Sequence, residues 1–182
     1  MKSIANLGAS PAALPVVSED LIELHAARIL LLFRLCGTND RIDGLTKMAK
    51  LDFFVRYPEF FQQVCAYLGL PVSRVAITRE SGMVRFHYGP WDNRYYQVLA
   101  FLEGRGLISV SKNRNAFQFT LTAKGKQVAE ELRSAAPFIG IVQHMKAVKK
   151  ILGNRTGSAL KNLVYKVFSK EVTDKPIGEA IR

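Results

Sequence analysis

The chain has 182 residues, 48% of them hydrophobic, and a formal net charge of +11. This length and composition suit one compact domain with a sizeable core. They exclude a membrane span, because no stretch reaches the roughly 18 consecutive apolar residues that a span needs.

The N-terminal segment is expected to be a flexible arm. Residues 1–17 lack the compact apolar core of a signal peptide. A first helix is predicted from Ser18 to Leu35, because Ser18, Glu19 and Asp20 provide a cap and an acidic first turn. Its apolar face is broad, which indicates a central, much-buried helix.

Two further helices are predicted next along the chain. The second runs from Arg41 to about Arg56, and the residue before Pro58 ends it. Pro58 suits the first turn of a third helix, residues 59–68. Residues 72–88 contain only short extended pieces, and Gly89-Pro90 interrupts the chain.

The next segment has the order of elements found in a winged helix. A helix that Asp92 caps is predicted to end at Gly106, with Tyr96 facing inward. Alternating residues then predict two strands, 107–111 and 116–121, which pair as a hairpin. A basic turn, residues 112–115, forms the tip, and another helix begins near Gln127.

We therefore predict a mostly α-helical fold with a small β-hairpin, a winged-helix domain with extra N- and C-terminal helices. The winged-helix core spans residues 18–136, after the arm at 1–17. Residues 137–172 form basic C-terminal helices, and residues 173–182 form a tail.

Positive charge is concentrated in the second part of the chain. Residues 1–103 hold 11 basic and 10 acidic residues, whereas residues 104–182 hold 15 basic and 5 acidic ones. Such an imbalance favours a polyanionic partner, although a solvated basic surface remains an alternative.

Catalytic motifs are missing from the sequence. His25, His87 and His144 lie far apart and have no metal-ligand spacing, and no phosphate-binding loop or nucleophile elbow occurs. Cys36 and Cys65 lie in apolar helical patterns, which indicates buried thiols. We predict no enzyme activity, no metal and no cofactor.

Four carboxylates come closest to a constellation that could carry chemistry. They lie among basic residues but lack the strand-borne spacing of a nuclease, so a salt-bridge network is the favoured interpretation. The residues are Asp40, Asp43, Asp52, Asp92, Lys47, Lys50 and Arg94.

Two binding faces are predicted. The first would contact DNA phosphates through basic residues of the wing and the later helices: Lys112, Arg114, Lys124, Lys126, Lys146, Lys149 and Lys150. The second would contact a protein partner, since amphipathic aromatic residues are enriched at interfaces: Lys47, Lys50, Arg56, Tyr57, Tyr88, Trp91 and Tyr95. Lys47, Lys50 and Asp52 fit either a docking surface or salt bridges that support the core.

Two segments together resemble a known family. They are RIDGLTKMAKLDFFVRYPEFF, residues 41–61, and MVRFHYGPWDNRYYQVLAFLEGRGLI, residues 83–108. The combination resembles the middle component of bacterial ABC-three-component systems, the group that includes Lamassu-type anti-phage defence. The resemblance spans roughly residues 20–135.

The resemblance implies a non-catalytic accessory subunit of a cytoplasmic complex. Its partners would be an SMC-like ABC ATPase and an effector, often a nuclease, and it would help to hold the effector inactive. Contact with double-stranded DNA without sequence preference is compatible with this role.

A free-standing winged-helix transcription regulator is the alternative. Its recognition helix would use Asn93, Arg94 and Gln97 at base edges. Residues 137–170 would then form the dimer interface.

Overall fold

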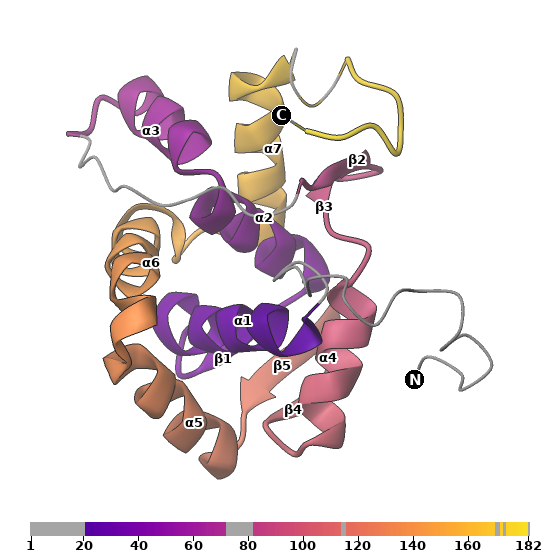
Figure 1. Cartoon of the computed structure of the whole chain (residues 1–182). Coiled ribbons are helices and arrows are strands. Elements are labelled where there is room, and N and C mark those ends of the chain that lie inside the picture. Colours follow the sequence, from indigo (N-terminus) through magenta and orange to yellow (C-terminus); the bar gives the residue numbers. More distant parts are fainter. Residues whose placement is uncertain (1–20, 72–81, 114–115, 170–171, 173, 182) are drawn as a thin grey trace, which may run out of the picture.

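The computed structural model describes residues 21–71, 82–113, 116–169, 172 and 174–181. Figure 1 shows a mostly helical fold with small antiparallel sheets, which confirms the expected fold class at this level. The elements are α1 (Ile22–Cys36), β1 (Arg41–Asp43), α2 (Leu45–Arg56), α3 (Pro58–Tyr67), β2 (Val84–Phe86), β3 (Gly89–Trp91), α4 (Tyr95–Gly104), β4 (Ile108–Asn113), β5 (Ala116–Leu121), α5 (Ala123–Ser134), the 3-10 helix η3 (Ala136–Phe138), α6 (Ile139–Leu152) and α7 (Gly157–Val167). The predicted arm, residues 1–17, and the predicted cap at residues 18–20 lie outside the described residues.

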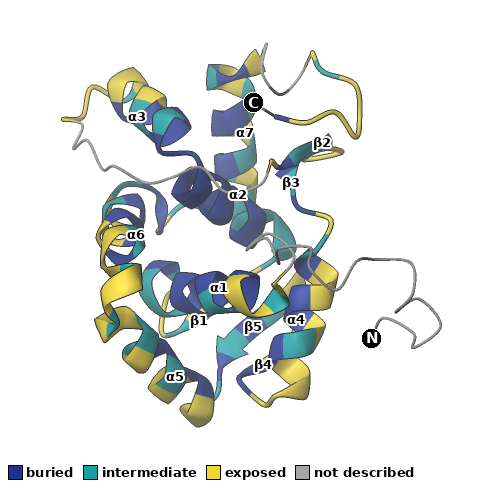
Figure 2. Ribbon diagram, viewed as in Figure 1, coloured by how far each residue is buried: buried dark blue, intermediate teal, exposed yellow. Residues whose placement is uncertain are grey.

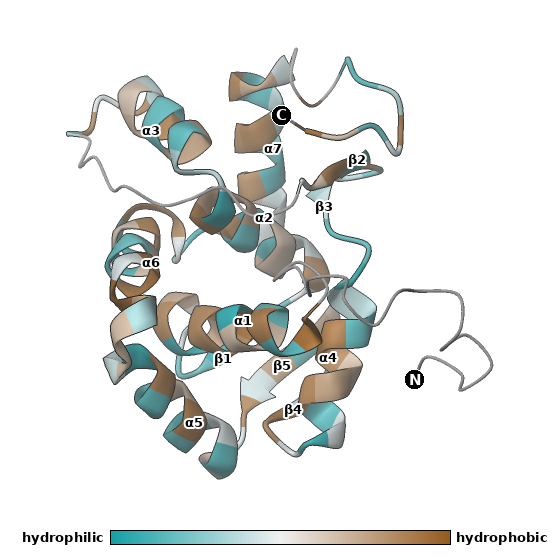
Figure 3. Cartoon of the chain, in the orientation of Figure 1, coloured by the Kyte–Doolittle hydropathy of each residue, from teal (hydrophilic) through white to brown (hydrophobic). Residues whose placement is uncertain are grey.

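The central position of α1 agrees with the prediction. Every residue from Ile29 to Phe33 is buried, so this helix meets neighbours on nearly all sides (Figure 2). It packs against α2, α4, α5 and α6. Hydrophilic residues predominate on α5, at the outer edge of the fold (Figure 3).

A three-stranded sheet has the order β1-β5-β4. The hairpin β4–β5 is present as predicted, and its buried residues Ile108 and Leu121 face each other. Gly106 has a left-handed φ of 67° just after α4, again as predicted. On the other side of β5, Ile42 of β1 pairs with Phe119, which places both in the core.

The predicted start of the second helix at Arg41 is wrong. Residues 41–43 form β1 instead, and α2 begins at Leu45. Asn39 and Asp40 have φ values of 52° and 59°, and Gly44 has 89°. These left-handed turns on both sides of β1 separate it from the helices.

A second hairpin, β2–β3, was not predicted. Gly89 and Pro90 were expected to interrupt the chain, but they belong to β3, where Pro90 lies opposite Arg85. The extended piece expected at residues 75–77 lies outside the described residues.

Residues 178–181 belong to the segment that was expected to be a tail, yet they pack beside β2. The amide of Arg85 donates to Glu179 O at 2.8 Å, and the amide of Ile181 donates to Met83 O at 2.8 Å. The Ile181 side chain is buried. This pairing gives β2 a neighbour on each side.

The C-terminal helices share the core with the rest of the chain. Helix α6 packs on α1 and α2, and α7 packs on α2. The buried residues of α7 are Leu160, Leu163 and Val164. None of the described helices is long and apolar enough to cross a membrane.

Candidate protein-docking groove

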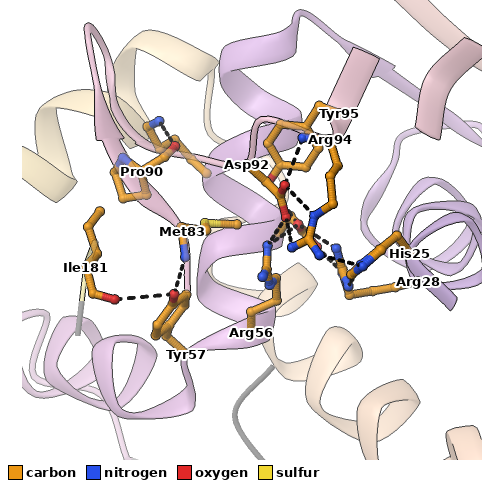
Figure 4. Close-up of polar contacts among 12 residues, drawn as sticks. His25, Arg28, Arg56, Tyr57, Met83, Pro90, Asp92, Arg94, Tyr95 and Ile181 are labelled. Carbon is orange, nitrogen blue, oxygen red and sulfur yellow. Dashed lines mark hydrogen bonds and ion pairs between the residues drawn. The ribbon is translucent and has the colours of Figure 1, made fainter. Parts of the chain in front are cut away.

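A buried ionic network lies beneath the N-terminus of α4. Asp52, on α2, is fully buried and accepts from the Nε of Arg28 at 2.8 Å. The hydroxyl of Tyr95 donates to the other oxygen of Asp52 at 2.8 Å. Burial and the adjacent Asp52 charge raise the pKa of Tyr95 well above its usual value. These contacts join α1, α2 and α4 (Figure 4).

Asp92 forms the second half of this network. It accepts from Arg56 at 2.7 Å and from the Nε of Arg94 at 2.9 Å. Burial alone would raise the pKa of Asp92, but the hydrogen bonds from Arg94 and the charge of Arg56 hold it well below its usual range. The Nδ1 atom of His25 lies 3.1 Å from Arg28 Nη1, and its Nε2 atom lies 2.8 Å from Arg94 Nη1 (Figure 4).

These carboxylates take part in ion pairs within the described part of the chain. Asp52 is held by the guanidinium groups of Arg28 and Arg56, and Asp92 by those of Arg56 and Arg94. The other two acids singled out in the sequence pair elsewhere: Asp40 with Arg34 and Lys126, and Asp43 with Arg41. The favoured interpretation, a salt-bridge network rather than a nuclease centre, fits this arrangement. Among the described residues, no group of three or more His, Cys, Asp or Glu side chains could hold a metal ion.

Lys50 is the unusual charged residue of α2. It is 1% exposed and donates from Nζ to Pro90 O at 3.0 Å. Burial lowers its pKa to about 7, because the charged form loses its hydration. Gly89, with φ 93°, lies beside the Lys50 side chain; a Cβ at this position would lie 3.4 Å from Lys50 Cε.

A surface pocket of about 220 Å³ opens beside Lys50, and a second of about 200 Å³ adjoins it. Leu45 and Tyr96 line both pockets, and we call the two adjoining pockets together the aromatic groove. The first pocket is lined by Leu45, Thr46, Lys50, Phe86, Tyr88, Gly89, Trp91 and Tyr96. The second is lined by Leu45, Tyr96, Leu99, Ala100, Glu103, Val110, Phe117 and Phe119.

Ring contacts organise the first pocket. Trp91 stacks on Phe86, with centroids 5.8 Å apart, and meets Tyr96 at 5.7 Å. Tyr88 and Tyr96 nevertheless remain 60% and 63% exposed. A cluster of exposed aromatic side chains over a concave surface is typical of an interaction site.

The residues predicted to bind a protein partner separate into two groups. Lys50, Tyr88 and Trp91 line the aromatic groove. Lys47 is half-buried and lies outside it. The remaining three residues are buried in the core, which leaves them no surface for a partner: Arg56, Tyr57 and Tyr95. Their charges and hydroxyls serve the chain itself, as Tyr57 does by accepting from the amide of Met83 at 2.6 Å (Figure 4).

The predicted inward position of Tyr96 is wrong. Tyr95 points into the core toward Asp52, and Tyr96 points outward into the groove. The prediction also did not include Leu45, Phe86 and Phe117 in the site. Phe117 is 48% exposed, although alternation places it on the same side of β5 as buried Phe119, so no sign in the sequence indicated its position in the groove.

Some of the residues predicted to contact DNA near the hairpin are exposed, and others make contacts within the chain. Lys112 is exposed at the end of β4, and Arg114 lies outside the described residues. Lys124 donates to Arg105 O at 3.0 Å. Lys126 pairs with Asp40 at 3.1 Å, although its side chain remains 48% exposed.

The basic residues of α6 are remote from α4 in the fold. Figure 1 shows the two helices on opposite sides of α1. Lys146 and Lys150 are exposed. Lys149 instead donates to Gly37 O at 2.6 Å, beyond the last turn of α1, where a cation is favoured by the free carbonyl groups.

The candidate base-reading residues at and before the start of α4 also differ in their surroundings. Asn93 and Gln97 are exposed. Arg94 binds Asp92 through two guanidinium nitrogens. A side chain held in this way is not directed at a base edge.

Comparison with known proteins found no matching family model, and neither a curated protein nor a solved structure matched the chain.

Proposed function

We propose that the chain is a non-catalytic accessory subunit that docks onto a partner protein through the aromatic groove. The observation that carries this proposal is the outward face of α4. Tyr96, Ala100 and Glu103 on this face line the groove. An apolar, aromatic and partly acidic face suits a protein surface and opposes a phosphate backbone.

The order of the elements supports a winged-helix interpretation of residues 22–134. In that fold, helix, strand and helix precede a recognition helix and a hairpin, and the strand order is that of β1-β5-β4. Helix α4 then corresponds to the recognition helix and β4–β5 to the wing. Helix α3 and the β2–β3 hairpin form an insertion before α4, and this insertion supplies one wall of the groove.

The partner we propose is the SMC-like ABC ATPase of a three-component anti-phage defence system. The chain would bridge this ATPase and an effector. Support comes from the resemblance of residues 41–61 and 83–108 to the middle component of such systems. These same segments supply the whole lining of the first pocket: Leu45, Thr46 and Lys50 from one, and Phe86, Tyr88, Gly89, Trp91 and Tyr96 from the other.

Co-purification with the ATPase encoded beside the chain tests this proposal. A Tyr96→Ala variant is expected to weaken the association about 30-fold, because a central aromatic anchor contributes about 2 kcal/mol or more. Gln97→Ala is the matched control, since Gln97 is exposed on the same helix but does not line the groove. Full recovery of the ATPase with Tyr96→Ala, or none with the unmodified chain, would refute the proposal.

Contact with double-stranded DNA without sequence preference is a second proposed role, favoured by the exposed side chains of Lys112, Lys146 and Lys150. Two unrelated duplexes should then bind equally, and more weakly as salt rises. Lys112→Glu should weaken both alike. A preference of roughly a thousandfold for one duplex would instead favour the transcription regulator, and no binding at low salt would remove this second role.

A further inference from the structure

Lys50 has unused hydrogen-bonding capacity at the base of the aromatic groove. An ammonium group has three donors, and one contact is made by Lys50 Nζ, to Pro90 O at 3.0 Å. No carboxylate of the described residues forms an ion pair with it; Asp52 of the same helix pairs with Arg28 and Arg56 instead. A buried cation of this kind gains the most from an anion brought by a partner.

The size of the first pocket suits one amino-acid side chain. Its volume of about 220 Å³ is below the roughly 300–1,000 Å³ of sites for drug-sized molecules. Apart from Lys50 and Thr46, aromatic and apolar groups line it. Such walls can pack against the methylene groups of a side chain, and the Lys50 amine can donate to the charged group at its end.

The charge of the site matches a carboxylate better than a phosphate. Among the described residues that line the first pocket, the single cation is Lys50. A phosphate group, at about −1.5 to −2, would be left partly uncompensated. Lys161 lies outside the lining, with Nζ 5.7 Å from the centroid of the Tyr88 ring, and adds positive potential near the mouth.

The second pocket specifies the neighbouring residue of the partner. Its lining is apolar except for Glu103. Leu45 and Tyr96 line both pockets, so the pockets are close enough for a single bound segment to occupy both. An aliphatic or aromatic side chain fits there, whereas a second acidic one would face Glu103.

We infer that the aromatic groove binds a partner protein through an Asp or Glu side chain, whose carboxylate reaches Lys50, and an adjacent apolar side chain in the second pocket. The inference rests on the proposed docking function of the groove and adds the chemistry of what is bound. The acidic residue specifies the register of the partner, and the apolar residue supplies buried area.

Selection of random peptides displayed on phage against the full chain tests this inference. The enriched peptides are expected to hold Asp or Glu beside a large apolar residue. One such peptide free of tryptophan, and its counterpart with Glu replaced by Gln, are then titrated. Fluorescence of Trp91 reports binding, because it is the single tryptophan of the chain and lines the first pocket.

At pH 6, where the folded chain keeps the proton on Lys50, we expect the Gln peptide to bind at least tenfold more weakly. In a Lys50→Met variant the two peptides should bind equally, and Lys146→Met, an exposed lysine on α6, should leave the preference unchanged. Equal binding of the two peptides to the unmodified chain would overturn the inference, as would enrichment of no peptide or a preference that persists without Lys50. The peptide comparison requires no variant of the chain, so it holds even if Lys50→Met fails to fold.

The Tyr96→Ala variant separates the two proposals. Suppose that the variant weakens the binding of both peptides, and that the Glu and Gln peptides bind the unmodified chain equally. The docking proposal is then supported, and the inference about Lys50 is overturned. If the variant leaves peptide binding unchanged, the peptides bind elsewhere and the inference is overturned, whereas the docking proposal is then decided by recovery of the ATPase.

Discussion

Replacement of Lys50 by methionine is expected to stabilise the folded chain at low pH. Methionine resembles the lysine stem in length and flexibility, and it removes the buried charge. The pKa of Lys50 falls from 10.5 to about 7 on folding. At about 1.4 kcal/mol per pH unit, holding the ammonium in the folded state costs on the order of 5 kcal/mol below pH 7.

One contact is lost in the variant. Pro90 O would no longer receive the Lys50 hydrogen bond, and an unsatisfied buried acceptor costs about 1–3 kcal/mol. We therefore expect Lys50→Met to be more stable than the unmodified chain by about 2–4 kcal/mol at pH 6.

The difference should change sign with pH. Between about pH 7 and 10.5 the unfolded chain keeps a proton on Lys50 that the folded chain has released. The unmodified chain therefore gains stability as pH rises through this window. Above it, the variant should be less stable by about 1–3 kcal/mol, the value of the lost hydrogen bond.

Urea denaturation at intervals from pH 6 to pH 10.5 measures this difference, because the other titrating groups are common to both chains. Lys146→Met provides the control; Lys146 is exposed, and its removal should change stability by less than about 0.5 kcal/mol. A variant that is less stable than the unmodified chain at pH 6 would refute the reasoning, since the folded chain would then favour the ammonium.

Three further predictions concern the fold. Asp52→Asn should lower the free energy of unfolding by about 3–5 kcal/mol, because buried guanidinium groups lose their counter-charge. Calorimetry should then record a fall of roughly 6–20 °C in Tm. An unchanged Tm would contradict the burial of the network. Thr122→Ala removes the hydroxyl that accepts from the amide of Gly125 at 3.0 Å and should cost about 1 kcal/mol, most of which Thr122→Ser should recover. Burial raises the pKa of Cys36 to about 12, so a disulfide reagent at pH 8 should label it only when the chain unfolds; rapid labelling of Cys36 in the native state would be the opposing result.

The sequence was informative where structure follows from neighbouring residues. The left-handed Gly106 and the alternation along β4 and β5 are local features. The helix expected near Gln127 is present but begins earlier, at Ala123, with Thr122 as its cap. The three residues of β1 offer no such pattern. They form a strand because Ile42 fits opposite Phe119, far along the chain, and this pairing is a tertiary effect.

The site was harder to predict because it depends on which of two adjacent tyrosines is buried. Both Tyr95 and Tyr96 fit an amphipathic helix. The hydroxyl of Tyr95 reaches Asp52 on α2, and that acceptor is invisible in the local sequence. Once Tyr95 is fixed inward, the 100° step of the helix turns Tyr96 outward.

The role of Lys50 could not be assigned for a similar reason. In the sequence it shares a helix with Lys47 and Arg56, and a charged residue at this spacing commonly faces solvent. Its burial results from a tertiary contact, because Lys50 Nζ donates to Pro90 O of β3 and Gly89 lies beside the side chain. The β2–β3 hairpin was missed because Gly89-Pro90 ordinarily ends regular structure.

The pairing of residues 178–181 with β2 has a consequence for the order in which the chain matures during synthesis. A ribosome adds about 5–20 residues per second from the N-terminus. The amide of Ile181 binds Met83 O, so the β2–β3 wall gains its second neighbour several seconds after Trp91 and Tyr96 have been made. We therefore expect a nascent chain to form α4 before β2 has both of its neighbours.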